Sequence, residues 1–394
     1  MNHFKKQQIQ NIADFNPREQ LAKGALAKSV PMAMLKEFQR QITGYETKAF
    51  NGGTKFRNGD TLLAKITPCL ENGKTAFVDI LDDGEVAFGS TEFIVLRAKN
   101  ETNPEFLYYF AISPDFRKRA IECMEGTSGR QRVNENALKT LELPIPEPQT
   151  QQSIAAVLSA LDKKIALNKQ INVRLEEMAK TLYDYWFVQF DFPDANGKPY
   201  KSSGGEMVFD ETLKREIPKG WESIELQYCL AKIPNTTKIL NKDIKDFGKY
   251  PVVDQSQDFI CGFTNNEKSI LTPQDAHIIF GDHTRIVKLV NFQYARGADG
   301  TQVILSNNER MPNYLFYQII NQIDLSSYGY ARHFKFLKEF KIILPSKDIS
   351  QKYNEIANTF FVKVRNNIKQ NHHLTQLRDF LLPMLMNGQV SVAE

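Results

Sequence analysis

The chain has 394 residues and a formal net charge of +4, with 42% hydrophobic and 24% charged residues. This balance is typical of a folded globular protein, and the length favours two domains or more. No run of about 18 apolar residues occurs, so no membrane span is expected. The first ten residues, MNHFKKQQIQ, lack the apolar core of a signal peptide.

The cysteines, the histidines and the net charge limit the kinds of protein and binding site that the chain can form. The four cysteines lie far apart without a Cys-x-x-Cys pair, so we expect reduced thiols in a cytoplasmic protein. The six histidines show no ligand spacing with them, so no metal site is expected. A pI of about 8.6 permits nucleic-acid binding but does not by itself argue for it.

Residues 1–147 read as a first module of strands and turns. KFRNGDTLLAKI and EVAFGSTEFIVLRA alternate turn residues with apolar runs, and Gly59–Asp60 leads into one of these runs. A short aromatic helix, NPEFLYYFAIS, follows, and then a basic loop, TSGRQRVNENA. This order predicts an α+β module that ends in the strand LELPIP.

Residues 148–190 predict a single long helix, because Gln151 to Phe187 contain neither proline nor glycine. The helix would be about 54 Å long at about 1.5 Å per residue. Its apolar positions alternate spacings of four and three, which predicts a coiled-coil seam. The seam positions are Ile154, Leu158, Leu161, Ile165, Asn168, Asn172, Leu175, Ala179 and Leu182.

The second half of the chain repeats this plan. Residues 191–220 are rich in Gly, Pro and Ser and read as a linker. Residues 221–346 form a second module, in which Gly281–Asp282 leads into an apolar strand. Residues 347–388 form a second long helix, and residues 389–394 a tail. At one constant offset the strand and helix of the first copy match the second without a gap.

Four asparagines lie at the middle of the two helices. Asn168 falls on Asn367 in the repeat, and Asn172 falls on Asn371. In an antiparallel pair, Asn168 would approach Asn371 and Asn172 would approach Asn367. A slip of one heptad would bury these amides unpaired, at about 1–3 kcal/mol each. We therefore expect the four asparagines to set the register; the alternative is a seam that is wet at its centre.

No catalytic constellation is visible in the sequence. The Gly-Lys-Thr of ENGKTA lacks the glycine that a phosphate-binding loop needs five residues before Gly73, where Pro68 stands instead. An adenine methyltransferase would need an Asn/Asp-Pro-Pro-aromatic tetrad, which DFNPRE does not supply. Pro114–Asp115 has no following Glu-x-Lys as in one nuclease class. We therefore expect no catalytic residues and no cofactor in this chain.

Basic and amide side chains instead gather in the loops of both modules. Arg pairs with guanine edges, Asn and Gln with adenine, and Lys with phosphate. A single such residue is usually only a solvated charge, but two sets in corresponding modules predict a DNA-binding surface used twice. The candidates are Lys55, Arg57, Asn72, Lys74, Arg130, Gln131 and Arg132 in the first module, and His283, Thr284, Arg285, Tyr294, Arg296, Arg332, His333 and Lys335 in the second. The long helix would then be a spacer between two DNA contacts.

Several stretches resemble the specificity subunit of type I restriction–modification systems. They are LYDYWFVQFDFPDANGKPYKSSGGEMV with REIPKGWE, the C-terminal LRDFLLPMLMNGQV, LPIPEPQTQQ and GYARHF. The resemblance covers almost the whole chain. It implies two α+β target-recognition domains, separated by two long antiparallel helices with pseudo-two-fold symmetry, that read a bipartite double-stranded DNA site.

The same resemblance implies the partners. Two modification subunits would methylate adenine with S-adenosylmethionine, and restriction subunits would translocate and cut DNA with ATP and Mg. The aromatic residues Tyr183, Tyr185, Trp186 and Phe187 would dock the modification subunits. Because these four side chains cover more than one face of a helix, they cannot all lie in a two-helix seam; the alternative is that they pack within the chain.

Two other readings remain open from the residues alone. A coiled-coil adaptor protein would join two partner proteins and bind DNA without sequence preference. A fused methyltransferase would need the motifs that are missing here. A neighbouring gene with an Asn-Pro-Pro-aromatic tetrad would favour the specificity subunit over the adaptor.

Overall fold

The computed structural model describes residues 4–99, 101–127, 129–233, 236–298, 300–329 and 332–392. The chain divides into two compact units: unit 1 extends to Leu167 and resumes at Gln370, and unit 2 spans Asn168–Lys369. The long helices α5 (Pro148–Tyr183) and α8 (Lys347–Met386) each contribute to both units. Within the described residues, no helix combines the length and apolar character that a membrane crossing requires.

Unit 1 joins strands and short helices to the first part of α5 and the last part of α8. Its other elements are β1 (Phe4–Gln8), α1 (Ile9–Ile12), β2 (Ala13–Phe15), β3 (Leu26–Val30), η1 (Met32–Met34), β4 (Glu46–Ala49), β5 (Thr54–Phe56), β6 (Thr61–Ala64), β7 (Thr75–Phe77), β8 (Ala87–Gly89), β9 (Phe93–Ala98), α2 (Pro104–Ile112), α3 (Pro114–Glu122), β10 (Met124–Glu125), β11 (Arg132–Val133), α4 (Glu135–Thr140) and β12 (Glu142–Pro146).

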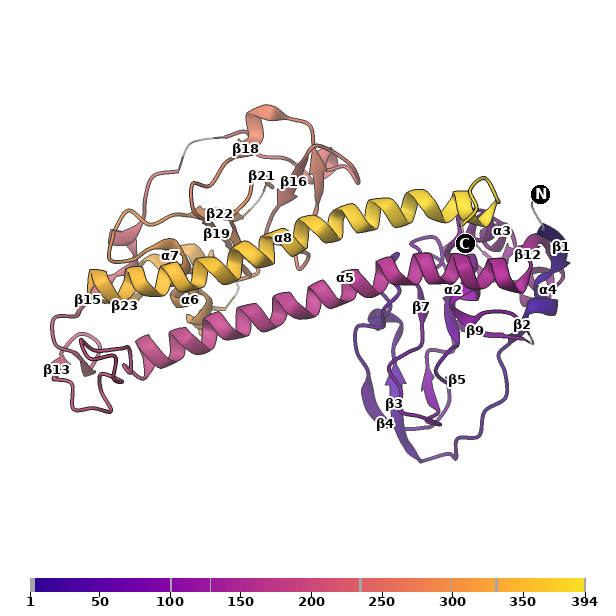
Figure 1. Cartoon of the computed structure of the whole chain (residues 1–394), viewed down its shortest axis with the longest axis horizontal. Coiled ribbons are helices and arrows are strands. Elements are labelled where there is room, and N and C mark those ends of the chain that lie inside the picture. Colours follow the sequence, from indigo (N-terminus) through magenta and orange to yellow (C-terminus); the bar gives the residue numbers. More distant parts are fainter. Residues whose placement is uncertain are drawn as a thin grey trace. The chain divides into compact units, whose positions relative to one another are not determined.

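Two four-stranded sheets make up the body of unit 1, in the orders β2-β9-β6-β7 and β4-β3-β8-β5. One apolar cluster lies between strands of the two sheets, and another joins the first sheet to α2, α5 and the end of α8. The helix α2 packs against the early part of α5 (Figure 1). Asn103 caps α2 by accepting a bond from the Phe106 N–H, and Pro104 suits the first helical turn.

Unit 2 contains the corresponding set. Its elements are the π-helical turn η2 (Asp184–Val188), β13 (Met207–Asp210), β14 (Arg215–Pro218), β15 (Glu222–Glu225), η3 (Leu226–Cys229), η4 (Asn241–Asp243), β16 (Tyr250–Val253), β17 (Gly262–Thr264), η5 (Glu267–Ser269), β18 (Ile270–Leu271), β19 (His277–Gly281), β20 (Val287–Val290), β21 (Tyr294–Arg296), β22 (Thr301–Ile304), α6 (Asn313–Gln322), η6 (Ser326–Tyr328), α7 (His333–Lys338) and β23 (Lys341–Leu344).

The strand orders show that the two units share one topology. The sheet β17-β16-β21-β18 repeats β4-β3-β8-β5, including a parallel pair at its centre, and β20-β19-β22 repeats β7-β6-β9. In both units the strand that precedes the long helix pairs antiparallel with a strand from the start of the repeated module: β12 with β1, and β23 with β15. The chain is therefore an α+β protein of two repeated units that share two long helices.

The two Gly-Asp turns do not occupy equivalent places, as the sequence had suggested. Gly59–Asp60 precedes β6, whereas Gly281 ends β19, which is the counterpart of β6. Both turns lie between apolar strands, so the local sequence pattern cannot tell which strand of a hairpin a turn leads into.

The segment 191–220, expected to be a linker, is folded within unit 2. Strands β13 and β14 form an antiparallel hairpin. Phe192 stacks on Trp221 with ring centroids 4.9 Å apart, and on Tyr200 with centroids 4.6 Å apart. The glycines and prolines of this segment mark tight turns that are fixed by aromatic packing.

Candidate nucleic-acid interface

In unit 1 two connections come together at one end of β6. The Thr67 N–H donates to the Gln131 carbonyl at 3.1 Å, and the Gln131 N–H donates to the Thr67 hydroxyl at 3.0 Å. The connection between β6 and β7, which carries Asn72 and Lys74, therefore lies beside the loop that carries Arg130. Asn72 and Arg130 are exposed, so this end of unit 1 presents an amide and a cation to solvent.

Arg132 belongs to the same loop, but its guanidinium is already paired. Its Nε and Nη2 donate to both carboxylate oxygens of Glu92, at 2.7–3.1 Å. The hydrogen bond from Arg132 lowers the pKa of the Glu92 carboxyl below its usual value. To bond a guanine edge, Arg132 would have to leave Glu92, whereas Arg130 needs no such exchange.

Lys55 and Arg57 lie away from this loop pair. The Lys55 ammonium donates to the Glu19 carbonyl at 3.0 Å and lies over the Phe50 ring. Arg57 lies 3.8 Å from the Glu19 carboxylate. They belong with Asp60 and Arg97, which lie at the end of β6 opposite to Lys65. The seven candidates of the first module therefore form two groups rather than one surface.

Unit 2 assembles its loops around the turn between β19 and β20. The Thr284 hydroxyl donates to the Gln255 carbonyl at 2.9 Å, and the His283 N–H donates to the Gln255 side chain at 3.1 Å. Asp282 accepts the Phe334 N–H on its carboxylate at 2.8 Å. These bonds bring His283–Arg285 beside Arg332 and Lys335, all of which are exposed.

Two of the expected DNA-binding residues are buried, which corrects the sequence reading. Tyr294 is 0% exposed, and its hydroxyl meets the His277 ring at 3.2 Å. His333 is 3% exposed and bonds the carbonyls of Asp282 and Gly329. Arg296 is partly buried. Tyr294 and His333 position the loops instead of facing DNA, because aromatic side chains beside charged ones can serve either a surface or a core.

The basic loops that remain occupy corresponding places in the two units. In each, one loop follows an inner strand of its sheet (β6 or β19), and the other precedes the helix (α4 or α7) before the final strand. The exposed candidates in these loops are Asn72, Arg130 and the Glu92-paired Arg132 in unit 1, and His283, Thr284, Arg285, Arg332 and Lys335 in unit 2. Gln255 and Asp282 position the second set; the sequence had marked Asp282 only as a turn residue and had not pointed to Gln255.

The asparagines of the long helices make polar contacts inside each unit. The Asn367 amide donates to the Asn172 side-chain oxygen at 2.8 Å in unit 2. In unit 1 the Asn371 amide donates to the Ile165 carbonyl at 3.3 Å. Asn168 is 1% exposed. The expected pairing of Asn168 with Asn371 would join the two units and stays a prediction.

Two further contacts show that α5 and α8 run antiparallel in each unit. In unit 1, Arg378 donates to Asp162 at 2.8 Å, and both are buried. In unit 2, the Tyr353 hydroxyl donates to the Ala179 carbonyl at 3.0 Å. The sequence analysis missed Asp162 and Arg378. The only feature of the sequence that could have indicated them is that each is a charged residue next to the apolar seam of its helix.

The aromatic cluster at the end of α5 is mostly interior. Tyr183, Trp186 and Phe187 are 6–8% exposed and pack on Tyr353 with ring centroids 5.3–6.4 Å apart. Only Tyr185, at 38%, is exposed. The expected docking role is therefore wrong for the three buried rings, because the chain itself covers them.

Comparison with known proteins finds similar chains among the specificity subunits of type I restriction enzymes. Residues 15–177 match the family described as "Type I restriction modification DNA specificity domain". The MjaIX specificity subunit of Methanocaldococcus jannaschii is 28% identical over 313 residues, 74% of this chain and 70% of that protein. The HindI specificity subunit of Haemophilus influenzae is 28% identical over 408 residues, 85% of this chain and 87% of that protein.

A solved structure shares the fold. The S subunit from M. genitalium superimposes with a TM-score of 0.56 and 19% identity, over 98% of this chain and 96% of that one. The fold, the repeated topology and the sequence relatives agree with one another. Residues 15–177 thus match a type I specificity domain, and the chain is similar over most of its length to specificity subunits of type I restriction enzymes.

Proposed function

We propose that this chain selects the DNA sequence for a type I restriction–modification complex, with one unit for each half of a bipartite site. The observation that carries the proposal is the repetition of exposed basic loops at corresponding places of two like-folded units. Cations near phosphates supply affinity, whereas guanidinium and amide groups at base edges supply specificity.

The proposal includes a division of labour with partner subunits. This chain contributes recognition and no catalytic group. Two modification subunits methylate adenine with S-adenosylmethionine, and restriction subunits use ATP and Mg to translocate and cut DNA. The complex acts in the cytoplasm. The family relationship supports this assignment.

A module exchange tests the assignment of one unit to one half-site. Residues 221–346 are replaced by the corresponding module of a relative, and the methylated motif is mapped in cells that also express the modification subunit. One half of the motif should change while the other half stays. A change in both halves, or in neither, would contradict the proposal.

Point variants then test the loops. Replacing Arg285, Arg332 and Lys335 by alanine should weaken DNA binding and relax recognition of one half-site only. Each lost phosphate contact lowers the slope of log K against log salt by about 1, and each lost base contact costs about 1–3 kcal/mol. Alanine at the exposed Lys198 and Lys201 is the matched control, since these lysines lie in the folded segment before β13.

A further inference from the structure

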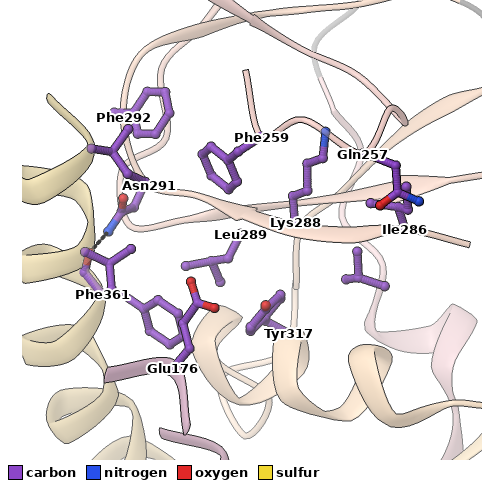
Figure 2. A pocket seen from close by; sticks show the side chains of 13 residues that line it. Glu176, Gln257, Phe259, Ile286, Lys288, Leu289, Asn291, Phe292, Tyr317 and Phe361 are labelled. Carbon is purple, nitrogen blue, oxygen red and sulfur yellow. Dashed lines mark hydrogen bonds between the residues drawn. The ribbon is translucent and has the colours of Figure 1, made fainter. Parts of the chain in front are cut away.

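Unit 2 contains a pocket of about 220 Å³ between β20 and the long helices (Figure 2). Its walls are mainly apolar: Leu289 lies in β20, Phe292 follows that strand, Phe259 comes from the loop before β17, and Phe361 comes from α8. Pockets for drug-sized ligands occupy about 300–1,000 Å³. This one is smaller and suits a single side chain or an equally small molecule.

One carboxylate lies at the mouth of this pocket. Glu176 projects from α5, and Figure 2 shows its carboxylate beside Leu289 and Phe361. Among the described residues it has no hydrogen-bond or ion-pair partner, and the surrounding protein raises the pKa of its carboxyl by desolvation. Glu176 is itself exposed, so its carboxylate is available to a cation that enters the pocket.

The nearby cations of the chain are held elsewhere. Lys288 also lines the pocket, but its ammonium donates to the carbonyls of Asp254 and Asp258. The Arg365 guanidinium donates to the Asn291 carbonyl at 3.3 Å. Neither therefore serves as the counter-ion of Glu176.

Unit 1 shows what fills the corresponding place there. Residues Gly89 to Pro104 align without a gap with Gly297 to Pro312, which makes β22 the counterpart of β9. Through the pairing of β6 with β7 and of β19 with β20, Phe77 then corresponds in position to Leu289, and Asp79 to Asn291. In unit 1 the Arg40 guanidinium lies 4.3 Å from the centre of the Phe77 ring. It bonds Asp79 at 2.8 Å and Glu105 at 3.0 Å, and Arg40 is 7% exposed.

The absence of that arginine from unit 2 has a local cause. Arg40 belongs to the connection between β3 and β4, residues 31–45. The counterpart between β16 and β17, residues 254–261, is shorter and contains neither arginine nor lysine. Phe259 of this shorter connection reaches the pocket wall but leaves the site of the guanidinium open.

We propose that the unit 2 pocket binds a guanidinium on an aliphatic stem, with Glu176 as its counter-ion. The bound group lies against Leu289 and Phe292, as the Arg40 guanidinium lies over Phe77 in unit 1. The group is either an arginine side chain of a partner protein or a free alkylguanidine.

Agmatine is the probe for this pocket, titrated into the full chain by calorimetry. The wild type should bind it, and Glu176→Gln should weaken binding at least tenfold. Glu177→Gln is the matched control: Glu177 is the next residue of α5, is exposed, and pairs with Arg174 at 2.7 Å. Equal affinity of wild type and Glu176→Gln, or no binding by the wild type, would overturn the proposal.

A second variant supplies the cation from the chain itself. Phe259→Arg should abolish agmatine binding. It should also raise the midpoint of thermal unfolding, and this rise should be larger when Glu176 is present than in a chain that also carries Glu176→Gln. Equal shifts in the two backgrounds would show that the arginine does not meet Glu176 and would overturn the assigned counter-ion.

Agmatine binding by the free chain and by its complex with the modification subunits shows whether the natural occupant is a partner arginine or a small molecule. Of the experiments on this pocket, only this one rests on the proposed function. If a partner arginine fills the pocket, agmatine binds the free chain but not its complex with the modification subunits. In that case Glu176→Gln, but not Glu177→Gln, also weakens assembly. If agmatine binds free chain and complex equally, the natural occupant is a small molecule.

Discussion

The two units hold the same helix pair by different chemistry. In unit 1, Asp162 of α5 accepts bonds from Arg378 of α8 and from the Tyr109 hydroxyl of α2, each at 2.8 Å. The repeat equates Asp162 with Phe361, and Ala179 with Arg378. In unit 2, Phe361 stacks on Tyr314 with ring centroids 5.2 Å apart, and the edge of Tyr317 meets it at 5.7 Å.

This difference shows that the backbone plan is repeated while the contacts are not. A buried ion pair loses the solvation of both charges, so it contributes less to stability than its geometry suggests, but removal of one partner is severe. Removing one ring of an aromatic stack leaves no unpaired buried charge behind. The ionic contact therefore makes the two ends of the helix pair chemically distinct, and α5 facing a copy of itself would set Asp162 against an alanine.

Removal of Arg378 is the largest expected effect. Arg378→Ala leaves the buried Asp162 carboxylate without its cation, and we expect a loss of about 3–5 kcal/mol in the free energy of unfolding of unit 1. Urea unfolding measures it. Lys163→Ala, which removes the exposed ion pair with Glu105, is the control and should cost less than about 1 kcal/mol. A loss below about 1 kcal/mol for Arg378→Ala would refute the contrast between the units.

Replacement of both ionic partners sharpens the comparison. The double variant Asp162→Leu/Arg378→Leu has no buried charge, so it should be more stable than either single variant, within about 2 kcal/mol of the wild type. Double-mutant-cycle analysis of urea midpoints measures the coupling. If the double variant were as unstable as Arg378→Ala, packing rather than charge would explain the contact.

Unit 2 should instead show a sensitivity to acid. Burial lowers the pKa of His277 to about 4, and His277 is 7% exposed. The unfolded state then binds more protons than the folded state between about pH 6.5 and 4, so stability falls as the pH falls through that window. The loss is at most about 3 kcal/mol.

The pH profile of a variant isolates this contribution. His277→Leu should flatten the decline between about pH 6.5 and 4, whatever its effect at pH 7. Thermal unfolding followed across that range measures it. An unchanged slope in the variant would show that His277 is not the group that titrates.

The asparagine pair should give the smallest effect. Asn172→Leu leaves the Asn367 amide without its partner at a partly buried position, which costs about 1 kcal/mol. The double replacement by leucine should recover that loss, since both polar groups are then removed. Additive losses in the cycle would mean that the two amides do not interact.

Much of this architecture could be predicted from the sequence because it depends on periodicity. The constant offset and the spacing of apolar residues predicted the repeat and both long helices. The folded segment 191–220 could not be predicted, because its stability comes from contacts such as Phe192 with Trp221 that are far from local. Composition describes the turns of such a segment but not its tertiary partners.

For the candidate DNA-binding residues, the positions of the loops could be predicted from the sequence, but the burial of individual side chains could not. Loops rich in arginine were found at the correct ends of the strands, since turn residues mark those ends. Burial of Tyr294 and His333 could not be predicted, because nothing in YARG or YARHF shows which side chain turns inward. The role of Asp282 depends on a bond to Phe334, 52 residues away.

The most direct test of the central claim is a map of N6-methyladenine in cells that carry this chain with its modification subunit, compared with cells that lack only this chain. The specificity assignment predicts a bipartite methylated motif that disappears when the chain is deleted. An unchanged set of methylated sites would contradict it and favour an adaptor protein without sequence preference.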